Sequence, residues 1–422
     1  MTSRRNEKIK SGLFIFRVDD SRLMRKSIFA LTIAAFGIGT SEYVIVGLLP
    51  DLAQSFRISI PTAGIIVSAY ALSVTFGSPL VALALSKQER KRSLIILMSI
   101  FLLGNLCCAV SSSLFFMLAA RILTALCHGA FFGTGSIVAA NLVPKEKRAQ
   151  AITTMFSGLT LANVLGVPAG TAIGHAFGWR STFIALIPIG LIAMMGLIFW
   201  VSPQKSEPVH LRHEFHTLLN PKVLLVLALS TLSSVSLFTV FTYIAPILMA
   251  VTHLPAHATA WVLVLFGVGI TIGILIGGRL GDWHQMRTII GGYVLVVLIL
   301  LLMPLAMPHA VAMAACVLVW GMFHFGASAP LQARIVEKAR RAPNLASTLN
   351  QGAFNLGNAL GASLGGIVLA AGYSYRILPL AGALVASLVI LIAFFAIKLD
   401  SSRATDPDLV LLYEDGSAVH KN

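Results

Sequence analysis

The chain of 422 residues is 57% hydrophobic and only 11% charged, whereas about one quarter of the residues in a soluble domain are charged. This composition excludes an ordinary soluble domain and indicates a membrane protein. The formal net charge of +15 is distributed between apolar runs rather than over one soluble face. We therefore expect a lipid bilayer around the chain and no nucleic acid as a partner.

Long apolar stretches separated by short polar connectors follow one another along the chain. A spanning helix needs about 20 mostly apolar residues, and a membrane β-barrel would instead show alternating segments of roughly ten residues. Twelve stretches fit the helical pattern: 27–49, 62–85, 93–111, 114–142, 149–173, 182–201, 223–249, 258–281, 288–307, 310–335, 345–371 and 376–397. The sequence predicts an all-α membrane protein with 12 transmembrane helices.

The positions of Lys and Arg predict the orientation, because these residues concentrate in cytoplasmic loops. With a cytoplasmic N-terminus, 27 of the 31 Lys and Arg residues fall on the cytoplasmic side and 3 on the other, while Arg121 lies inside a span. Both termini are therefore expected in the cytoplasm. A translation start at Met24, just ahead of the first span, is an alternative to Met1.

The longest internal connector divides the chain into two similar halves. "LANVLGVPAGT" (161–171) matches "LGNALGASLGG" (356–366) at an offset of 195 residues, and His128 and His324 are 196 residues apart. Such repeats around a central cavity are common in transporters. We expect five parts: an arm (1–26), a six-helix bundle (27–201), a cytoplasmic loop (202–221), a second six-helix bundle (222–397) and a tail (398–422).

Two ionisable residues lie in the middle of predicted spans, Glu42 in the first and Arg121 in the fourth. Charges at the bilayer centre are costly and usually mark ion or substrate paths. One interpretation is that Glu42 binds the coupling proton, while a nearby Arg121 or a cationic substrate favours its carboxylate. The alternative is a structural Glu42–Arg121 ion pair that joins the two spans.

Other polar residues in the spans have less specific meaning. His128 lies two helical turns after Arg121 on the same face, so it is a candidate proton relay or a hydrogen-bonded packing residue. The same alternatives apply to His324. The repeat-related amides of Asn163 and Asn358 are candidates for the cavity wall or for bridges between helices.

Glycines at helical spacing predict close helix contacts. In the fifth span Gly166 and Gly170 flank Pro168, and in the eleventh Gly361 and Gly365 repeat the spacing. Small residues four apart allow two helices to approach closely, and a proline inside a helix allows a bend. These positions are interpreted as packing seams along which helices can rock.

The sequence lacks the motifs of the common energy-coupling and hydrolytic enzymes. No G-x-x-x-x-G-K-[ST] or H-E-x-x-H occurs. We therefore expect no enzyme activity and no bound cofactor, with a proton as the coupling ion.

Several longer motifs resemble one known family. They are "FGIGTSEY" with "GLLPDLA" (36–53), "RILTALCHGAFFG" (121–133), "GLTLANVLGVPAGT" (158–171), "GWRSTF" (178–183), "APLQ" (329–332) and "GAFNLGNALGA" (352–362). From about residue 27 to 397 the chain resembles the major facilitator superfamily. Within it, the chain is most similar to the twelve-span drug:proton antiporter group and its AraJ/YdhP-like branch.

This resemblance implies further roles. The family's loop motif after the second span, G-x-L-x-D-R-x-G-R-R-R, falls on residues 82–92 and keeps Arg90 and Arg92, but Ser86 replaces its Asp. The repeat copy after the eighth span keeps Asp282 and Arg287, so gating is expected to depend more on Asp282. The fifth-span motif falls on 166–171 and favours export over uptake.

We therefore expect a monomeric transporter of the bacterial inner (plasma) membrane. It would export a small organic solute, such as a drug, sugar or metabolite, in exchange for protons. One rival function is proton-coupled uptake of a sugar or nucleoside. The other is a receptor or scaffold that transports nothing.

Overall fold

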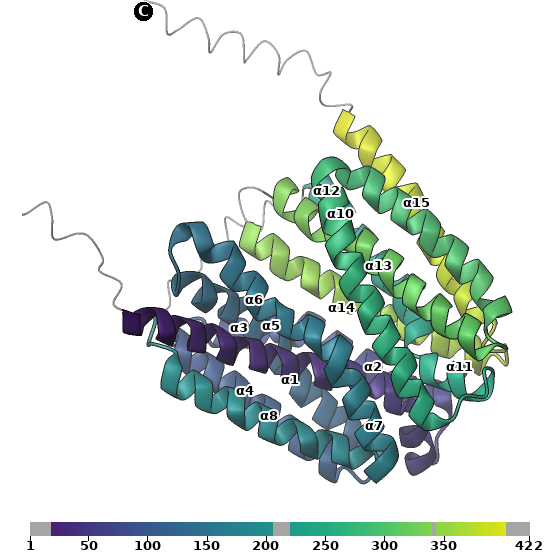
Figure 1. Cartoon of the computed structure of the whole chain (residues 1–422), viewed down its shortest axis with the longest axis horizontal. Helices are drawn as coiled ribbons and strands as arrows, with labels where there is room; N and C mark the ends of the chain where they lie inside the picture. The colour runs from purple at the N-terminus through teal and green to yellow at the C-terminus, as the bar shows by residue number, and fades with distance from the viewer. Residues whose placement is uncertain (1–17, 206–219, 340–342, 402–422) are drawn as a thin grey trace, which may run out of the picture.

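The regular elements of the protein are helices. The computed structural model describes residues 18–205, 220–339 and 343–401, and no β-strand occurs among them (Figure 1). The expected connector 202–221 lies mostly outside these ranges, as do most of the arm 1–26 and most of the tail 398–422. The all-α fold class predicted from the sequence is confirmed.

The first half of the chain forms the spans expected between residues 27 and 201. Two short π-helices, η2 and η4, interrupt the second and fifth spans, so that each of these spans consists of two α-helices. The elements are α1 (Val18–Phe56), α2 (Ile60–Leu72), η2 (Ser73–Gly77), α3 (Ser78–Ala84), α4 (Arg90–Val110), α5 (Leu114–Asn141), η3 (Lys145–Lys147), α6 (Arg148–Leu161), η4 (Ala162–Gly166), α7 (Val167–Phe177) and α8 (Trp179–Trp200).

The second half has a similar organisation. Its first span is broken near Tyr243, where α10 ends and α11 begins. The elements are α10 (Pro221–Phe241), α11 (Ile244–Ala250), α12 (Ala256–Ala306), α13 (Ala310–Lys338), α14 (Pro343–Ala370) and α15 (Ile377–Ser401).

The number of membrane crossings depends on how α12 is counted. Eleven helices of the described residues are long and apolar enough to cross a membrane, and α12 is one of them with 51 residues. At about 1.5 Å per residue it is roughly 77 Å long, more than twice a hydrocarbon core of about 30 Å. His284 has non-helical backbone angles (φ −150°, ψ 81°). α12 therefore contains both predicted spans, 258–281 and 288–307, and the twelve predicted crossings are accounted for.

Unusual backbone angles recur in the two halves. Arg57 and His253 have positive φ angles of 54° and 56° after the first span of each half, and they are 196 residues apart. Gly178 and Gly372 have φ angles of 88° and 85° before the last span of each half, and they are 194 residues apart. A positive φ is uncommon outside glycine. The repeated turns therefore support a duplicated six-helix unit.

The two halves meet closely at one end of the molecule. The helices of the halves converge where α7 and α11 lie and diverge toward the start of α1 and the end of α15 (Figure 1). In agreement, α7 contacts α12, α11 contacts α1, and α2 contacts α14. The Ser68 hydroxyl on α2 donates to the carbonyl of Ala359 on α14 (3.2 Å). We call this the convergent end.

Glycines allow α6 and α7 to lie directly against α1. A Cβ on Gly158 would overlap the backbone of Thr32, and one on Gly166 would overlap the side chain of Thr40. A Cβ on Gly170 would lie 2.7 Å from Val44 Cγ2. These three glycines form one seam along α1, with Pro168 inside α7 between the last two.

The corresponding seam of the second half joins α14 to α10. A Cβ on Gly361 would lie 2.6 Å from the carbonyl oxygen of Val235, and one on Gly365 would lie 2.7 Å from that of Thr239. Both neighbours are backbone atoms, which cannot move without shifting the helix. The glycine spacing in the sequence thus corresponds to close helix packing in both halves.

The seam on α1 can be tested with the smallest possible substitution. Gly158→Ala places a methyl group against backbone atoms of α1, so it should lower the free energy of unfolding by about 1–3 kcal/mol. Gly278→Ala is the matched control, since a Cβ there meets nothing within 4 Å. Thermal unfolding of the purified protein in detergent measures both. Equal unfolding midpoints for the two variants would contradict the seam.

Candidate functional site

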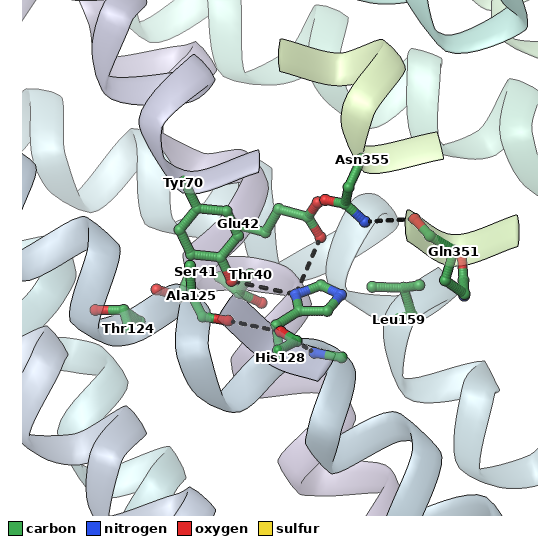
Figure 2. Close-up of polar contacts among 12 residues, drawn as sticks. Thr40, Ser41, Glu42, Tyr70, Thr124, Ala125, His128, Leu159, Gln351 and Asn355 are labelled. Carbon is green, nitrogen blue, oxygen red and sulfur yellow. Dashed lines mark hydrogen bonds and ion pairs between the residues drawn. The ribbon is translucent and has the colours of Figure 1, made fainter. Parts of the chain in front are cut away.

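The buried carboxylate of Glu42 lies in the interior of the first half. Glu42 lies on α1, and its side chain is 6% exposed. Its Oε2 atom is 3.7 Å from Nδ1 of His128 on α5. Figure 2 shows the imidazole below the carboxylate. Two of the residues singled out in the sequence thus form one site, although they are 86 positions apart.

Arg121 contacts the backbone of α1 rather than the carboxylate of Glu42. The guanidinium is fully buried. Its Nη1 donates to the carbonyl of Ser41 (2.7 Å), and its Nη2 donates to the carbonyl of Glu42 (3.1 Å). The alternative interpretation of a structural Glu42–Arg121 ion pair is therefore wrong for this arrangement. The planar guanidinium spans two successive carbonyls, and it holds α1 to α5 without using the carboxylate.

Tyr70 on α2, which the sequence did not predict as a site residue, connects Arg121 to His128. The Arg121 guanidinium lies over the Tyr70 ring, with Cζ 4.1 Å from the ring centroid. The Tyr70 hydroxyl is 3.2 Å from His128 Nδ1. A buried cation over an aromatic face is stabilised by the ring quadrupole. Tyr70 therefore supports the cation with its ring and orients the imidazole with its hydroxyl.

A second missed residue, Asn105 on α4, fixes the backbone segment that Arg121 holds. The Ser41 hydroxyl donates to Asn105 Oδ1 (2.9 Å), and Asn105 Nδ2 donates to the carbonyl of Phe101 (2.8 Å). Both side chains are fully buried. Three helices, α1, α4 and α5, thus converge on the turn that carries Glu42. A charge in the middle of a span identified Glu42 and Arg121 in the sequence. Tyr70 and Asn105 are neutral, so this signal does not find them.

The second half also contributes to this site. Asn355 of α14 is buried, and Figure 2 shows its amide and the Glu42 carboxylate pointing toward one another. Asn355 and Asn358 both lie in the motif 352–362, and the repeat between the halves predicted Asn358 as the candidate. Asn358 is also buried on α14, although it is not among the residues that Figure 2 places at the carboxylate.

The remaining amide and imidazole candidates lie elsewhere. Asn163 of η4 donates from Nδ2 to the carbonyl of Leu159 one turn earlier on α6 (3.0 Å). His324 belongs to a separate buried cluster of the second half, where its Nε2 is 3.5 Å from the Ser233 hydroxyl. The Tyr293 hydroxyl donates to the same Ser233. The structure therefore does not place Asn163 or His324 with Glu42.

The four predicted gating residues differ in their contacts. The Arg90 side chain donates from Nε to the carbonyl of Lys205 (3.2 Å), which connects the start of α4 to the segment that follows α8. The exposed Arg92 lies with Nε 3.7 Å from Oε2 of the partly buried Glu89. Asp282 and Arg287 are exposed at the middle of α12. Their role in gating stays a prediction.

The fold and this site can be set beside known proteins. The family model described as Major Facilitator Superfamily matches residues 31–350 and 227–410. The inner membrane transport protein YdhP of Escherichia coli (strain K12) is 45% identical over 374 residues, which are 88% of this chain and 96% of that protein. The chain belongs to the major facilitator superfamily. It is thus a membrane transporter and not an enzyme, and the predicted similarity to YdhP is confirmed.

Two further similar proteins are informative. The chloramphenicol resistance protein of Streptomyces lividans is 32% identical over 344 residues, 79% of this chain and 86% of that protein. Among solved structures, a bacterial homolog of the human lysosomal transporter Spinster superposes with a TM-score of 0.74 at 15% identity, over 89% of this chain and 97% of that chain. The structural match supports the major facilitator fold.

The role of the Arg121 guanidinium can be tested by a conservative substitution. Arg121→Lys keeps the charge but cannot bind two carbonyls and the Tyr70 face together. The expected loss of unfolding free energy is about 2 kcal/mol or more, because buried carbonyls lose their donors. Tyr70→Phe keeps the ring and should cost about 1 kcal/mol. Thermal unfolding measures these differences.

The matched control for Arg121→Lys is Arg180→Lys. Arg180 is exposed, lies 4.1 Å from the Trp179 ring centroid, and donates to the carbonyl of Ser111 (2.7 Å). Similar contacts near solvent should cost less to lose. If Arg180→Lys destabilises the protein as much as Arg121→Lys, burial is not what makes the Arg121 contacts important.

Proposed function

We propose that the protein is a proton-coupled antiporter that exports a small organic solute by alternating access. The observation that supports this proposal is the burial of the Glu42 carboxylate without a direct ion pair to Arg121. Among the described residues it is the buried carboxylate of the transmembrane interior, and the guanidinium nearest to it is held by backbone carbonyls. The carboxylate therefore remains available for a proton or for a cationic solute.

The free-energy cost of burying a charged carboxylate couples proton binding to solute binding at Glu42. An unpaired carboxylate is expensive away from water, so it must be compensated by a proton, by a cation or by a charged neighbour such as His128. Because Arg121 binds the backbone of α1, it compensates the carboxylate less than a direct ion pair would. Proton binding and solute binding at Glu42 then compete. Such competition produces exchange in opposite directions when the site faces the two sides of the membrane in turn.

Similarity to known proteins supports export of an organic molecule. The name of the Streptomyces lividans relative records chloramphenicol resistance. The fifth-span motif at 166–171 resembles that of drug:proton antiporters. We propose a small amphipathic organic compound as the class of solute. We further propose that the protein works as a monomer in the bacterial inner membrane with both termini in the cytoplasm.

Everted membrane vesicles test the proposal directly. Respiration acidifies their interior, and acridine orange reports the proton gradient. Addition of chloramphenicol, and of a panel of other amphipathic drugs, should release protons from vesicles with the wild-type protein because each solute molecule enters in exchange. Glu42→Gln should reduce this release to the level of vesicles without the protein, because the amide cannot exchange a proton.

A control variant and two contradicting outcomes accompany the vesicle experiment. Glu337→Gln removes an exposed carboxylate on α13 and should leave the exchange intact. Solute movement in the same direction as the protons would establish uptake by symport instead. An equal response from wild type and Glu42→Gln across the panel would contradict coupling through Glu42.

A further inference from the structure

Asn355 presents an unpaired hydrogen-bond acceptor toward the first half of the protein. Its Nδ2 donates to the carbonyl of Gln351 one turn earlier on α14 (3.0 Å). Its Oδ1 is buried and has no hydrogen-bond partner. The bond to Gln351 determines which end of the amide is which, since the reversed amide would set two oxygens against each other. The free end is therefore the carbonyl.

Hydrogen bonds between the two halves surround Asn355 and fix its position. The Thr75 hydroxyl on η2 donates to the carbonyl of Gly352 (3.2 Å), three residues before Asn355. The Ser68 hydroxyl on α2 donates to the carbonyl of Ala359 (3.2 Å), four residues after it. These contacts hold this part of α14 against the first half. Asn355 consequently faces the first half only while α2 and α14 are in contact.

Figure 2 shows the Asn355 amide and the carboxyl of Glu42 pointing toward one another. An ionised carboxylate has acceptors only, and a carboxamide oxygen is also an acceptor. Two acceptors directed at one another repel, and a buried acceptor without a donor destabilises the arrangement. A single proton on Glu42 removes both penalties, because the carboxyl then donates to the amide.

We propose that Asn355 accepts the carboxyl proton of Glu42 across the interface between the halves, so that proton binding favours closure at the convergent end. This proposal rests on the proposed role of Glu42 as the proton-binding group. Asn355 acts as a positioning residue. It makes the protonated form of Glu42 compatible with contact between α2 and α14, and it makes the ionised form unfavourable there.

The other polar groups around Glu42 do not replace this contact. His128 and Arg121 on α5, Tyr70 on α2 and Tyr43 on α1 are the titratable or charged neighbours. All four belong to the first half, so their contacts with the Glu42 carboxyl can persist when the halves separate, although the Tyr43 ring also packs against Phe238 of α10. Asn355 is the polar residue from the second half that Figure 2 shows at the carboxyl.

Spin-label distances between the halves test the proposal without a known solute. Labels attached after Phe177→Cys on α7 and Val311→Cys on α13 lie at highly exposed positions of the convergent end. The native cysteines Cys107, Cys108, Cys127 and Cys316 are replaced by alanine. Pulsed electron paramagnetic resonance then measures the distance between the two labels in lipid nanodiscs between pH 5 and 9. The short distance gives the fraction of closed molecules, and protons are the only ligand.

Substitutions at Asn355 should move the pH response in opposite directions. In the parent protein the closed fraction should increase as the pH falls. Asn355→Leu removes the acceptor and should shift the midpoint to lower pH by roughly one unit, the equivalent of one hydrogen bond of about 1.4 kcal/mol. Asn355→Asp should shift it to higher pH, because two adjacent carboxyls retain a shared proton. A purely structural role would not reverse the direction.

Two further variants complete the design. Glu42→Gln carries a permanent donor toward Asn355 and should be closed across the whole pH range. Asn350→Leu is the matched control, since this buried amide on the same helix donates to Gln332 within the second half (2.6 Å). Its pH midpoint should equal that of the parent.

The outcomes separate this proposal from the proposed function. If Glu42→Gln abolishes the pH response while both Asn355 variants keep the parent midpoint, Glu42 is the proton site and Asn355 is not its partner. If Glu42→Gln still responds to pH like the parent, the proton site itself is wrong. Equal shifts in Asn350→Leu and Asn355→Leu would also overturn the role of Asn355.

Discussion

The contact between the Arg121 guanidinium and the backbone of α1 is the interaction on which the interior of the first half depends. The guanidinium binds the carbonyls of Ser41 and Glu42 while its face covers Tyr70. One buried cation thereby joins α1, α2 and α5. Because its donors go to backbone atoms, the charge organises the helices and leaves the neighbouring carboxylate free to change its protonation state.

Much of the architecture could be predicted from the sequence, because membrane constraints act on composition directly. Apolar length reports the spans, and the cost of a charge in hydrocarbon identifies Glu42 and Arg121 as exceptional. The one complication in the number of crossings arises at His284, where the backbone leaves the helix for a single residue. No proline or glycine marks that position, so local sequence does not reveal that two spans form one continuous element.

The site could be predicted only in part. Glu42 and Arg121 were found from their charge, and His128 from its spacing to Arg121. Tyr70 and Asn355 are neutral, and residues like them occur in spans without special cost. Their importance depends on which helices are neighbours, and for Asn355 on contact between two halves whose sequences say little about their relative placement. Likewise, the alternative of a Glu42–Arg121 ion pair was wrong, because charge alone does not predict that a guanidinium will bind two backbone carbonyls instead.

The continuous path of α12 has a mechanical consequence. Its two membrane-spanning arms meet at His284 with no intervening loop, while the arm before His284 contacts η4 across the interface between the halves, where Gly267 lies against the backbone of Asn163 and Val164. A junction of one residue has few torsions in which to absorb displacement. A tilt of the part of α12 before His284 is therefore transmitted to the part after His284. The lipid-facing side of the second half would then move together with the solute pathway. The thickness and lateral pressure of the surrounding bilayer would consequently affect the free energy of the conformational change during transport.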